Sequence, residues 1–418
     1  MSDFDQQDNL TTGHAASGDS PVARALKNGR LIVCSGPGGV GKTTTAAALG
    51  LRGALMGRKT IVLTIDPARR LANSLGLDEL TNTPQPIALD GQIDLAIASQ
   101  KTSASQKTEP DTAAPGELWA MMLDQEQTLA ELVARHAPDP GALDRARENN
   151  IYRLLSSALH GMQEYMALEK LHDLYTAGYF DLVILDTPPT KNALDFLETP
   201  RRASRFFDDR IVKWFLPDRS SSKGFFGRVL NPGAVVQGLL SKIFGDSFIT
   251  DLIEFFDTFQ YLFEVLKERG DMIEFILRDP NTYFVVITSA DPRRIKEAQF
   301  FNQKLEALGQ KAQAFIINRV TPDFDPADLD ALDSGELSGL LKTHGLSDPT
   351  LIETTAQALK AHYRRLASRA QKDRAVIAEL AEKFSAERLQ AIPLLGQDVH
   401  TLGALLKLSA WLTPAPSA

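Results

Sequence analysis

Residues 31–45 read LIVCSGPGGVGKTTT, and this stretch decides the fold. The apolar run Leu31–Val33 predicts a buried strand, and the Ala- and Leu-rich run Thr44–Leu55 predicts a helix. The residues between them, Gly36 to Thr43, match the phosphate-loop pattern G-x-x-x-x-G-K-[ST]. A strand, a glycine loop and a helix in this order are the context that the motif requires, so they favour a phosphate site over a chance glycine turn.

The predicted loop offers several groups to a phosphate. Its glycines let backbone N–H groups approach phosphate oxygens without Cβ clashes, and the following helix adds its positive N-terminal dipole. Lys42 is expected to reach the β- and γ-phosphates, and the hydroxyl of Thr43 is expected to bind Mg²⁺. The loop residues predicted to bind nucleotide are Gly36, Pro37, Gly38, Gly39, Val40, Gly41, Lys42, Thr43 and Thr44.

Composition narrows the class of protein. With 43% hydrophobic and 23% charged residues, the 418-residue chain has the composition of an ordinary globular protein. Its net charge of −8 argues against general nucleic-acid binding. The one cysteine, Cys34, excludes an internal disulfide and a cysteine-based structural zinc site within one chain, and its place in the first strand predicts a buried apolar role. We find neither a signal peptide nor an apolar run of about 18 residues, and therefore expect a cytoplasmic protein.

Alternating strands and helices predict a doubly wound, mainly parallel α/β sheet of the phosphate-loop NTPase class, with large helical insertions. We assign residues 29–115, 179–190 and 281–418 to this core. The further strands predicted in it are Thr60–Ile65, Ile93–Ala98, Asp181–Asp186, Tyr283–Thr288, Ala312–Ile317 and Gln390–Pro393.

The remaining segments differ in character from the core. Residues 116–178 and 191–280 are predicted to form a helical insertion subdomain, because their apolar residues recur at helical spacing. Residues 1–28 are polar and are predicted to be a disordered tail that ends in a short helix. A charged helical hairpin is expected near residues 350–390, after an irregular Asp-rich segment at residues 322–345.

Two of the predicted strands lead into an aspartate. Asp66 follows the strand Thr60–Ile65, at the carboxyl end of a parallel strand, where ligands bind in such sheets. The run 181–186, DLVILD, closes a hydrophobic strand with Asp186, which is the Walker B pattern. Asp186 is therefore expected to hold Mg²⁺ through water.

The helical insertion is rich in phenylalanine. Twelve of the 21 Phe residues lie within residues 201–275. Residues 201–245 carry nine Lys and Arg against three Asp and Glu, whereas residues 246–279 carry three against nine. Two interpretations stay open: two helical layers that pack on each other with Phe as core, or a mobile hydrophobic groove for a protein or membrane partner. One helical stripe in this region is Phe248, Leu252, Phe255, Phe259, Phe263 and Leu266.

Several motifs together resemble one family. In order along the chain they are GPGGVGKTT, TIDPARRLANSL, LVILDTPPTKNALDFL, FIINRV and IPLL. They are similar to the successive motifs of the ArsA/Get family, the anion-pump ATPases and tail-anchored-protein targeting ATPases, within the broader MinD/ParA class of dimeric ATPases. The resemblance covers about residues 30 to 412 and implies ATP and Mg²⁺ as cofactors, and a homodimer or a heterodimer with a related ATPase.

The resemblance also implies roles for single residues. Asp66 matches the aspartate of the family's first switch, which orients the attacking water, and residues 186–192 look like the second switch. Asn318 matches the asparagine that reads the adenine amide edge, although a turn-capping role stays open. Pro393 begins the segment that would cover the adenine face.

The sequence departs from the family pattern at several positions. The signature lysine, which in relatives crosses the dimer to the partner's phosphates, is replaced by Pro37, while Arg69 and Lys191 introduce cations into the two switches. We expect one of these cations to replace the lysine, with Arg69 favoured because a guanidinium matches phosphate geometry; the alternative is that both are solvated surface charges. The cysteines that form the zinc clasp or bind arsenite in relatives are absent, so arsenite activation is not expected.

The sequence is compatible with three functions, of which the first is favoured. The leading hypothesis is a Mg²⁺-dependent ATPase, a nucleotide-gated dimer whose cycle moves the helical insertion against a protein or membrane-transport partner. The alternative is a weakly catalytic nucleotide-binding subunit of a heterodimer whose partner supplies the lysine missing at Pro37. A small-molecule kinase on the same fold is less favoured, because the Phe-rich region 201–275 suits a macromolecular client.

Overall fold

A computed structural model describes residues 20–66, 70–89, 116–136, 141, 144, 148–150, 162–189, 197–199, 242, 245–323, 334–396 and 398–413; the side chains of residues 246, 249 and 253–264 are not among those described. The predicted strand at Ile93–Ala98, the first 19 residues and most of the Phe-rich region before Gly245 lie outside these ranges. Among the helices described, none has both the length and the apolar composition that crossing a bilayer would need.

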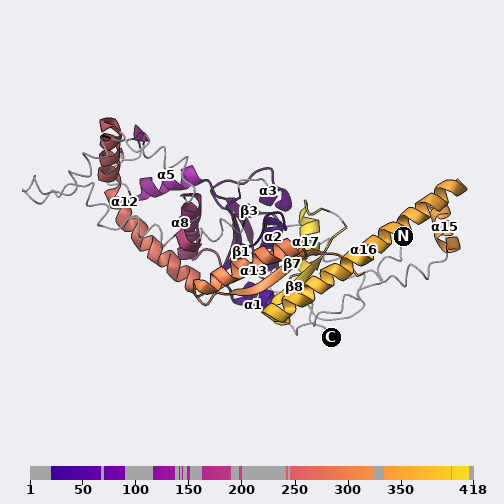
Figure 1. Cartoon of the computed structure of the whole chain (residues 1–418). Helices are drawn as coiled ribbons and strands as arrows, with labels where there is room; N and C mark the ends of the chain where they lie inside the picture. The colour runs from indigo at the N-terminus through magenta and orange to yellow at the C-terminus, as the bar shows by residue number, and fades with distance from the viewer. Residues whose placement is uncertain are drawn as a thin grey trace, which may run out of the picture.

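Eight strands form one sheet, in the order β3-β4-β2-β5-β1-β6-β7-β8 (Figure 1). Every neighbouring pair is parallel except β3 and β4, which are antiparallel. This confirms the doubly wound, mainly parallel α/β class. The strands are β1 (Leu31–Ser35), β2 (Thr60–Thr64), β3 (Gln85–Ile87), β4 (Leu118–Met122), β5 (Leu182–Asp186), β6 (Thr282–Ser289), β7 (Ala312–Val320) and β8 (Leu389–Pro393).

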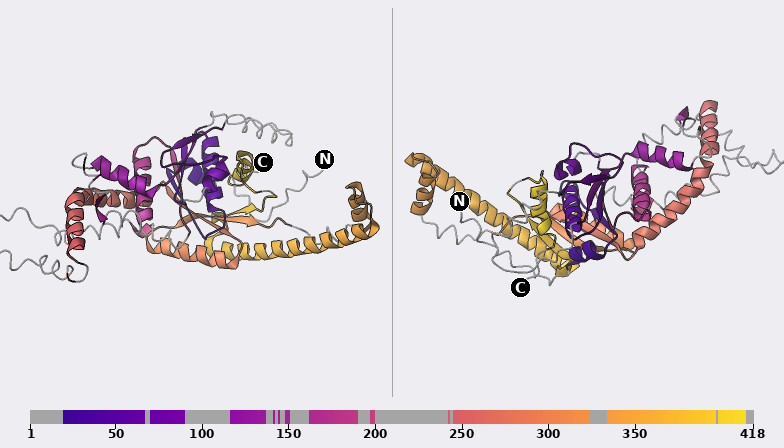
Figure 2. Two further views of the ribbon diagram at one scale, coloured as in Figure 1. Left: turned by 90° about the horizontal axis from the view of Figure 1, so that it is seen from above. Right: turned by 180° about the vertical axis from the view of Figure 1, so that it is seen from behind.

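Helices cover both faces of the sheet, so its strands are buried on both sides (Figures 1 and 2). In β1 the side chains alternate between two cores: Leu31 and Val33 face one, and Ile32 and Cys34 face the other. The second core contains α1 (Pro21–Asn28), α2 (Lys42–Leu55), α3 (Arg70–Leu75) and α17 (Leu402–Ala410). The first contains α5 (Gln125–His136), α8 (Met162–Thr176), α12 (Asp246–Arg278) and α13 (Pro292–Ala307).

Cys34 and the helix that precedes β1 both belong to the folded core. Cys34 is fully buried, and burial raises the pKa of its thiol, which confirms the expected apolar role. The short helix expected at the end of the tail is present as α1, and Ser20 caps it by accepting from the amide of Ala23. Val22 and Leu26 of α1 are buried, so this helix belongs to the folded core and the tail boundary at residue 28 was wrong.

The helical interpretation of residues 116–178 was wrong at its start. Residues 118–122, LWAMM, form β4, which lies parallel to β2 with Leu118 opposite Thr60. A short apolar run that is buried on both faces lacks the alternation of a half-exposed strand, so its periodicity cannot separate strand from helix. Pairing with β2 decides the outcome, and the helical part begins only at α5.

The expected helical hairpin at residues 350–390 is a single helix over most of its length. No Gly or Pro interrupts α16 (Pro349–Phe384), and Asp348 caps its start by accepting from the amide of Thr350 at 2.8 Å. The hairpin partner is α15 (Ser334–Thr343), in a segment that we had expected to be irregular. A short 3₁₀ helix, η2 (Ala386–Arg388), leads from α16 into β8.

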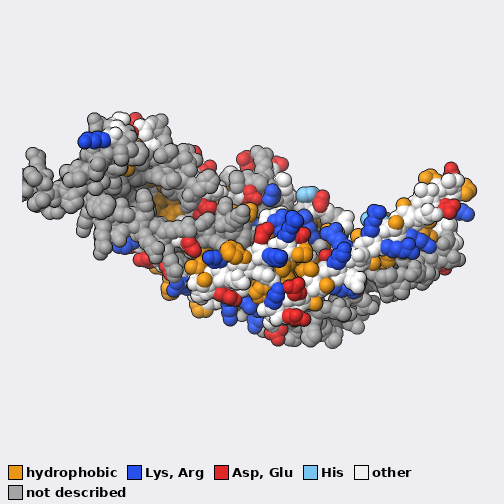
Figure 3. Space-filling model, viewed as in Figure 1, with side chains coloured by type: hydrophobic (Ala, Val, Ile, Leu, Met, Phe, Trp, Pro, Cys, Tyr) orange, Lys and Arg blue, Asp and Glu red, His pale blue; other side chains and the backbone are white. Residues whose placement is uncertain are grey.

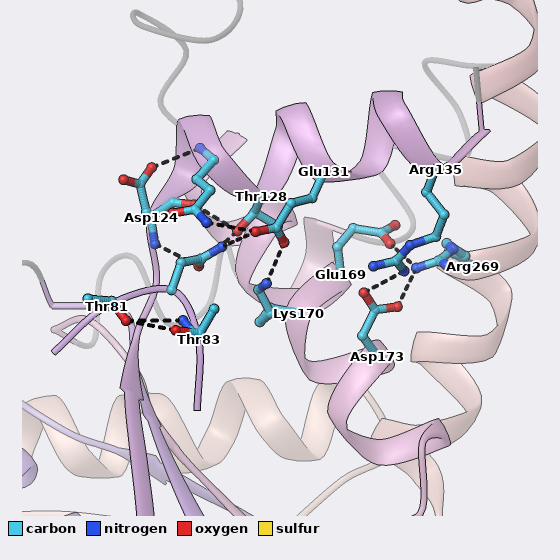
Figure 4. Close-up of polar contacts among 12 residues, drawn as sticks. Thr81, Thr83, Asp124, Thr128, Glu131, Arg135, Glu169, Lys170, Asp173 and Arg269 are labelled. Atoms are coloured by element: carbon cyan, nitrogen blue, oxygen red, sulfur yellow. Dashed lines mark hydrogen bonds and ion pairs between the residues drawn. The ribbon is translucent and has the colours of Figure 1, made fainter. Parts of the chain in front are cut away.

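Helices α5, α8 and α12 are joined by a partly buried ion network (Figure 4). The guanidinium of Arg269 on α12 donates to Glu169 at 2.7 Å and to Asp173 at 2.9 Å, both on α8. Arg135 on α5 donates to the other oxygen of Asp173 at 2.7 Å. Burial raises the pKa of Glu169; burial alone would also raise the pKa of Asp173, but its neighbours His172, Arg135 and Arg269 hold that pKa well below its usual range.

Removing the shared cation should destabilise the fold. In Arg269→Met, Glu169 remains buried without its charged partner, so we expect the free energy of unfolding at neutral pH to fall by about 3 kcal/mol. The loss should shrink in acid, because the raised pKa of Glu169 lets it become neutral and because the wild type loses the stabilisation from Asp173 as pH falls. Urea unfolding followed by circular dichroism at both pH values measures this difference.

A matched control comes from the same helix. Arg278 pairs with Glu274 at 2.8 Å, one turn away, and both side chains are substantially exposed. Arg278→Met should therefore cost less than about 1 kcal/mol at either pH. Equal losses for the two variants would contradict the structural role assigned to Arg269.

Candidate functional site

The phosphate-loop strand lies at the centre of the sheet. β1 has β5 on one side and β6 on the other, so the strand order reverses at β1: β2 to β5 lie on one side of it and β6 to β8 on the other. The carboxyl ends of β1, β2 and β5 therefore meet at one edge, where ligands bind in doubly wound sheets. Residues 36–41 connect β1 to α2 at this edge, as the motif predicts.

Two glycines of the loop are required by close backbone approach. Gly36 has φ +152°, and a Cβ there would lie 1.9 Å from the carbonyl oxygen of Ile287 in β6. Gly41 has φ +90°, and a Cβ there would lie 2.4 Å from Nδ2 of Asn318. The loop is thus pressed against β6 and β7, and no larger residue fits at either position.

Lys42 is the buried cation of the loop. Its ammonium donates to the carbonyl oxygen of Pro37 at 3.0 Å, and only 8% of the residue is exposed. Burial lowers the pKa of Lys42, and the carboxylates of Asp186 and Asp66 oppose that effect. A phosphate oxygen that takes the place of the Pro37 carbonyl would gain a charge-assisted hydrogen bond from a largely desolvated donor.

Asp186 is placed as expected for a metal-binding carboxylate. It is 1% exposed, and the burial raises its pKa to about 6 despite a hydrogen bond from Thr43. Its Oδ1 atom has no hydrogen-bond partner within the described ranges. A buried carboxylate with one oxygen still available, next to a threonine hydroxyl, fits a hard cation such as Mg²⁺, which Thr43 and Asp186 would hold.

Magnesium fits this sparse set of protein ligands. In the part of the chain that the structure describes, no cluster of three or more His, Cys, Asp or Glu is arranged to hold a metal ion. Mg²⁺ in nucleotide sites usually takes one or two protein ligands and completes its shell with waters and phosphate oxygens. Thr43 and Asp186 therefore stay our prediction for the protein ligands of Mg²⁺.

Thr64 links the two aspartates, and we had not identified it from the sequence. Its hydroxyl donates to Oδ2 of Asp186 at 2.9 Å and accepts from the backbone N–H of Asp66 at 3.2 Å. Thr64 is buried at the last position of β2, directly opposite Asp186 of β5. Aligning the two strands by the aspartates that end them would have found this pair.

The predicted first switch begins at Asp66, whose carboxylate is about a quarter exposed. Its Oδ2 lies 3.5 Å from Nη1 of Arg70, the first residue of α3. Arg69 lies outside the described residues, and so does Lys191 in the second switch. Within the described part of the chain, Arg70, which we had not singled out, is a cation placed beside Asp66.

The start of the predicted second switch is fixed to β1. Thr187 follows Asp186, and its amide and hydroxyl both donate to the carbonyl oxygen of Cys34, at 3.2 and 2.8 Å. A Cβ built on Gly38 of the phosphate loop would lie 3.9 Å from the side chain of Pro189. The residues directly after Asp186 thus lie beside the phosphate loop.

Asn318 lies at the loop, near the end of β7. Its Nδ2 donates to the carbonyl oxygen of Val40 at 2.9 Å, and its Oδ1 accepts from the amide of Arg319 at 2.9 Å. The second contact is the local capping that we had left open, and the first ties β7 to the loop. Pro393 pairs in register with Val320, on the neighbouring strand. Adenine recognition by Asn318 and Pro393 stays a prediction.

Substituting Asn318 separates adenine recognition from support of the phosphate loop. Asn318→Ala should weaken ATP binding by about 1–3 kcal/mol, because polar groups on the base and in the site lose their partner. GTP binding should weaken much less if the amide reads the adenine edge, so the preference for ATP should fall. Competition titrations with both nucleotides measure this; an equal loss for ATP and GTP would mean that Asn318 only supports the loop.

A contact from α8 reaches the first switch. The side chain of Gln163 donates from Nε2 to the carbonyl oxygen of Ile65 at 2.9 Å, one residue before Asp66. Gln163 lies in the first turn of α8, the helix that Arg269 joins to α12. The sequence offers no signal for this contact, because it crosses from the helical insertion to a strand about 100 residues earlier.

Comparisons with known proteins agree with this geometry. The profile of a family described as anion-transporting ATPase matches residues 29–334. A relative from Aquifex aeolicus, which bears the name arsenical pump-driving ATPase 1, is 24% identical over 70% of this chain and 64% of its own length. The ATPase ARSA1 of Chlamydomonas reinhardtii is 25% identical over 74% of this chain and 38% of its own length. The ATPase GET3C of Arabidopsis thaliana is 24% identical over 70% and 67%.

These similarities cover most of the chain but less of the relatives. The chain spans less than two thirds of the length of the Aquifex and Chlamydomonas proteins. The matched region, residues 29–334, contains the phosphate loop, both switch aspartates, α8 and Asn318, whereas α16 and β8 follow it.

Proposed function

The chain belongs to the anion-transporting ATPase family, and on that basis we propose that it is a Mg²⁺-dependent ATPase working as a nucleotide-gated dimer. The observation that carries the proposal is the convergence of Lys42, Asp66 and Asp186 at the carboxyl ends of three adjacent strands, with Thr64 joining the two aspartates. Phosphoryl transfer to water depends on positioning and electrostatics, and these residues supply both.

Each residue would contribute a different part of the reaction. The loop amides and Lys42 would bind the phosphates, and Thr43 and Asp186 would hold Mg²⁺, which would supply positive charge to neutralise the phosphate oxygens. Asp66 orients the attacking water and accepts its proton. Thr64 keeps Asp66 and Asp186 in a fixed relation, so that the water and the metal-bound phosphate are presented together.

We propose that the cycle is transmitted to the helices through α8. A change at Asp66 alters the end of β2, where the carbonyl oxygen of Ile65 holds Gln163. Because Arg269 clamps α8 to α12 through two carboxylates, a shift of α8 moves α12 as well. A conformational change at one element is transmitted in this way when packed helices move as rigid bodies.

Gln163 offers a direct test of this coupling. Gln163→Leu removes one hydrogen bond, so we expect kcat to fall about fivefold while the KM for ATP stays nearly constant. Hydrogen exchange in α12 should also lose its response to ATP. Gln127→Leu is the matched control, because the side chain of Gln127 is exposed on α5 and donates to Glu131 of its own helix. Unchanged nucleotide response in the Gln163 variant would contradict the coupling.

The client surface is proposed to lie in the Phe-rich region 201–275. Part of that region is core: Leu266 and Ile273 of α12 are buried beneath the sheet. Phe275 and Met272 of the same helix are 66% and 47% exposed and are available to a partner. The packing interpretation therefore describes one side of this part of α12, and a protein or membrane-transport partner remains our proposal for its exposed side.

The alternative is a subunit that needs a related ATPase to supply the lysine missing at Pro37. We propose instead that the chain carries its own replacement in Arg69 or Lys191. The test is phosphate release by the purified chain alone with ATP and Mg²⁺, combined with its oligomeric state by light scattering. Turnover with an ATP-dependent dimer supports the proposal; turnover that begins only after mixing with a related ATPase supports the alternative.

A further inference from the structure

The longest of the described helices, α16, packs on the rest of the fold along only part of its length. Its 36 residues correspond to about 54 Å of helix. In all three views it runs past the sheet and projects from the body, with α15 folded against its far end (Figures 1 and 2). We call α15 and the exposed part of α16 the arm.

The base of the arm is firmly anchored. Asp373 is buried and accepts hydrogen bonds from the amide and hydroxyl of Thr321, at 2.9 and 2.7 Å. Phe384 stacks on Phe315 of β7 with ring centroids 4.5 Å apart. The direction of the projecting part is therefore set by contacts with the end of the sheet.

The exposed side of α16 is strongly basic. Between residues 354 and 378 the sequence has six Lys and Arg and a single acid, the buried Asp373. On a helix of 3.6 residues per turn, three of these cations, Arg365, Arg369 and Lys372, lie on the side opposite the buried Ala367 and Ala370, whereas Arg374 pairs with Asp323 at 2.6 Å. Figure 3 shows Lys and Arg side chains spaced along this helix. The six are Lys360, Arg364, Arg365, Arg369, Lys372 and Arg374.

The far end of the arm is apolar and exposed. Leu340 of α15 is 56% exposed, and Leu351 and Leu359 of α16 are 53% and 45% exposed. Leu337 and Ile352 are buried, one on each helix, so the hairpin has its own small core and does not need these three leucines for packing. Hydrophobic side chains gather at this end in Figure 3.

We propose that the arm binds the surface of a bilayer that contains anionic phospholipids. Clusters of four to eight Lys and Arg on a helix attract anionic headgroups, and nearby leucines can enter the interface between headgroups and acyl chains. Duplex DNA or RNA would use the basic side alone and would leave the apolar end in water. The combination of a basic side with exposed leucines at its far end favours the membrane surface.

Vesicle sedimentation with the full chain tests the proposal. The protein should pellet with vesicles of phosphatidylcholine plus phosphatidylglycerol, and remain in solution with phosphatidylcholine alone. Binding should weaken as salt is added, because headgroup attraction is screened. Arg365→Gln, Arg369→Gln and Lys372→Gln combined should lower the affinity at least about tenfold. These side chains are exposed on the helix, so the variant should fold.

Two further variants make the result specific. Leu340→Ser with Leu351→Ser keeps every charge and should still weaken vesicle binding at least about threefold. Lys27→Gln, Lys296→Gln and Lys311→Gln remove the same number of exposed cations from the body of the protein and should bind like the wild type. All of these variants should retain wild-type ATP turnover in the absence of vesicles.

Three results would overturn the proposal. The first is no pelleting with anionic vesicles, and the second is equal loss of binding in the arm variant and in the body variant. The third is tighter binding to duplex DNA than to vesicles, lost in the charge variant and unaffected by the serine variant, which would identify the arm as a nucleic-acid surface. Each outcome is independent of whether the chain hydrolyses ATP.

Discussion

Lys42→Ala is expected to lower kcat/KM for ATP by about 10³-fold or more. The ammonium is a buried donor 3.0 Å from the carbonyl oxygen of Pro37, within the loop that would hold the phosphates. Charge on the γ-phosphoryl oxygens is stabilised by such fixed cations, and removing one donor from a preorganised site costs about 10²–10³-fold. The loss of ATP binding adds to this effect, so both turnover and a fluorescent-nucleotide titration should report it.

The variant should nevertheless fold. Burial lowers the pKa of Lys42, which means that the folded state holds this charge at a cost. Removing it should leave the thermal unfolding midpoint within a few degrees of wild type. Lys296→Ala, on the exposed side of α13, is the control with the same substitution. Retention of wild-type turnover by Lys42→Ala would mean that the loop is not the catalytic phosphate site.

Asp66→Asn is expected to reduce kcat by about 10³-fold while ATP affinity changes little. A positioned general base contributes about 10²–10⁴-fold, and the amide that replaces it has nearly the same size but cannot accept the proton of the attacking water. The backbone N–H of Asp66, which donates to Thr64, is retained in the variant, so the position of the switch should be unchanged. Single-turnover phosphate release and an ATP titration separate the chemical step from binding.

Asp78→Asn provides the comparison for this change. Asp78 is exposed shortly after α3, and its substitution should alter neither kcat nor affinity. Proportional loss of affinity and turnover in Asp66→Asn would assign Asp66 to nucleotide binding, and unchanged turnover would remove it from the mechanism.

The residues found from the sequence are those whose signal is local. Lys42, Thr43 and Asp186 each stand within a few residues of the motif that identifies them, and the strand before each motif is a continuous apolar run. The structure brings them together because parallel strands share one carboxyl edge. The fold class and this part of the site therefore follow from short stretches read separately.

The residues that were missed act across the chain. Thr64 matters only because it lies opposite Asp186, and Gln163 only because α8 is packed against the end of β2. Neither residue type is unusual for a strand or a helix. The helix predicted at residues 118–122 was wrong for a related reason: pairing with β2 overrides a short apolar pattern that fits strand and helix equally well. Such features depend on tertiary contacts that a single sequence does not encode locally.

The central place of β1 in the sheet has a consequence for biosynthesis. Leu31 pairs with Val183 on one side and with Thr282 on the other, so both neighbours of the phosphate-loop strand are translated long after it. At about 5–20 residues per second, the roughly 250 residues between Leu31 and Thr282 take on the order of 10–50 s to synthesise. The phosphate loop gains both neighbouring strands only after β6 has been synthesised, which makes nucleotide capture a late event relative to the synthesis of the loop itself.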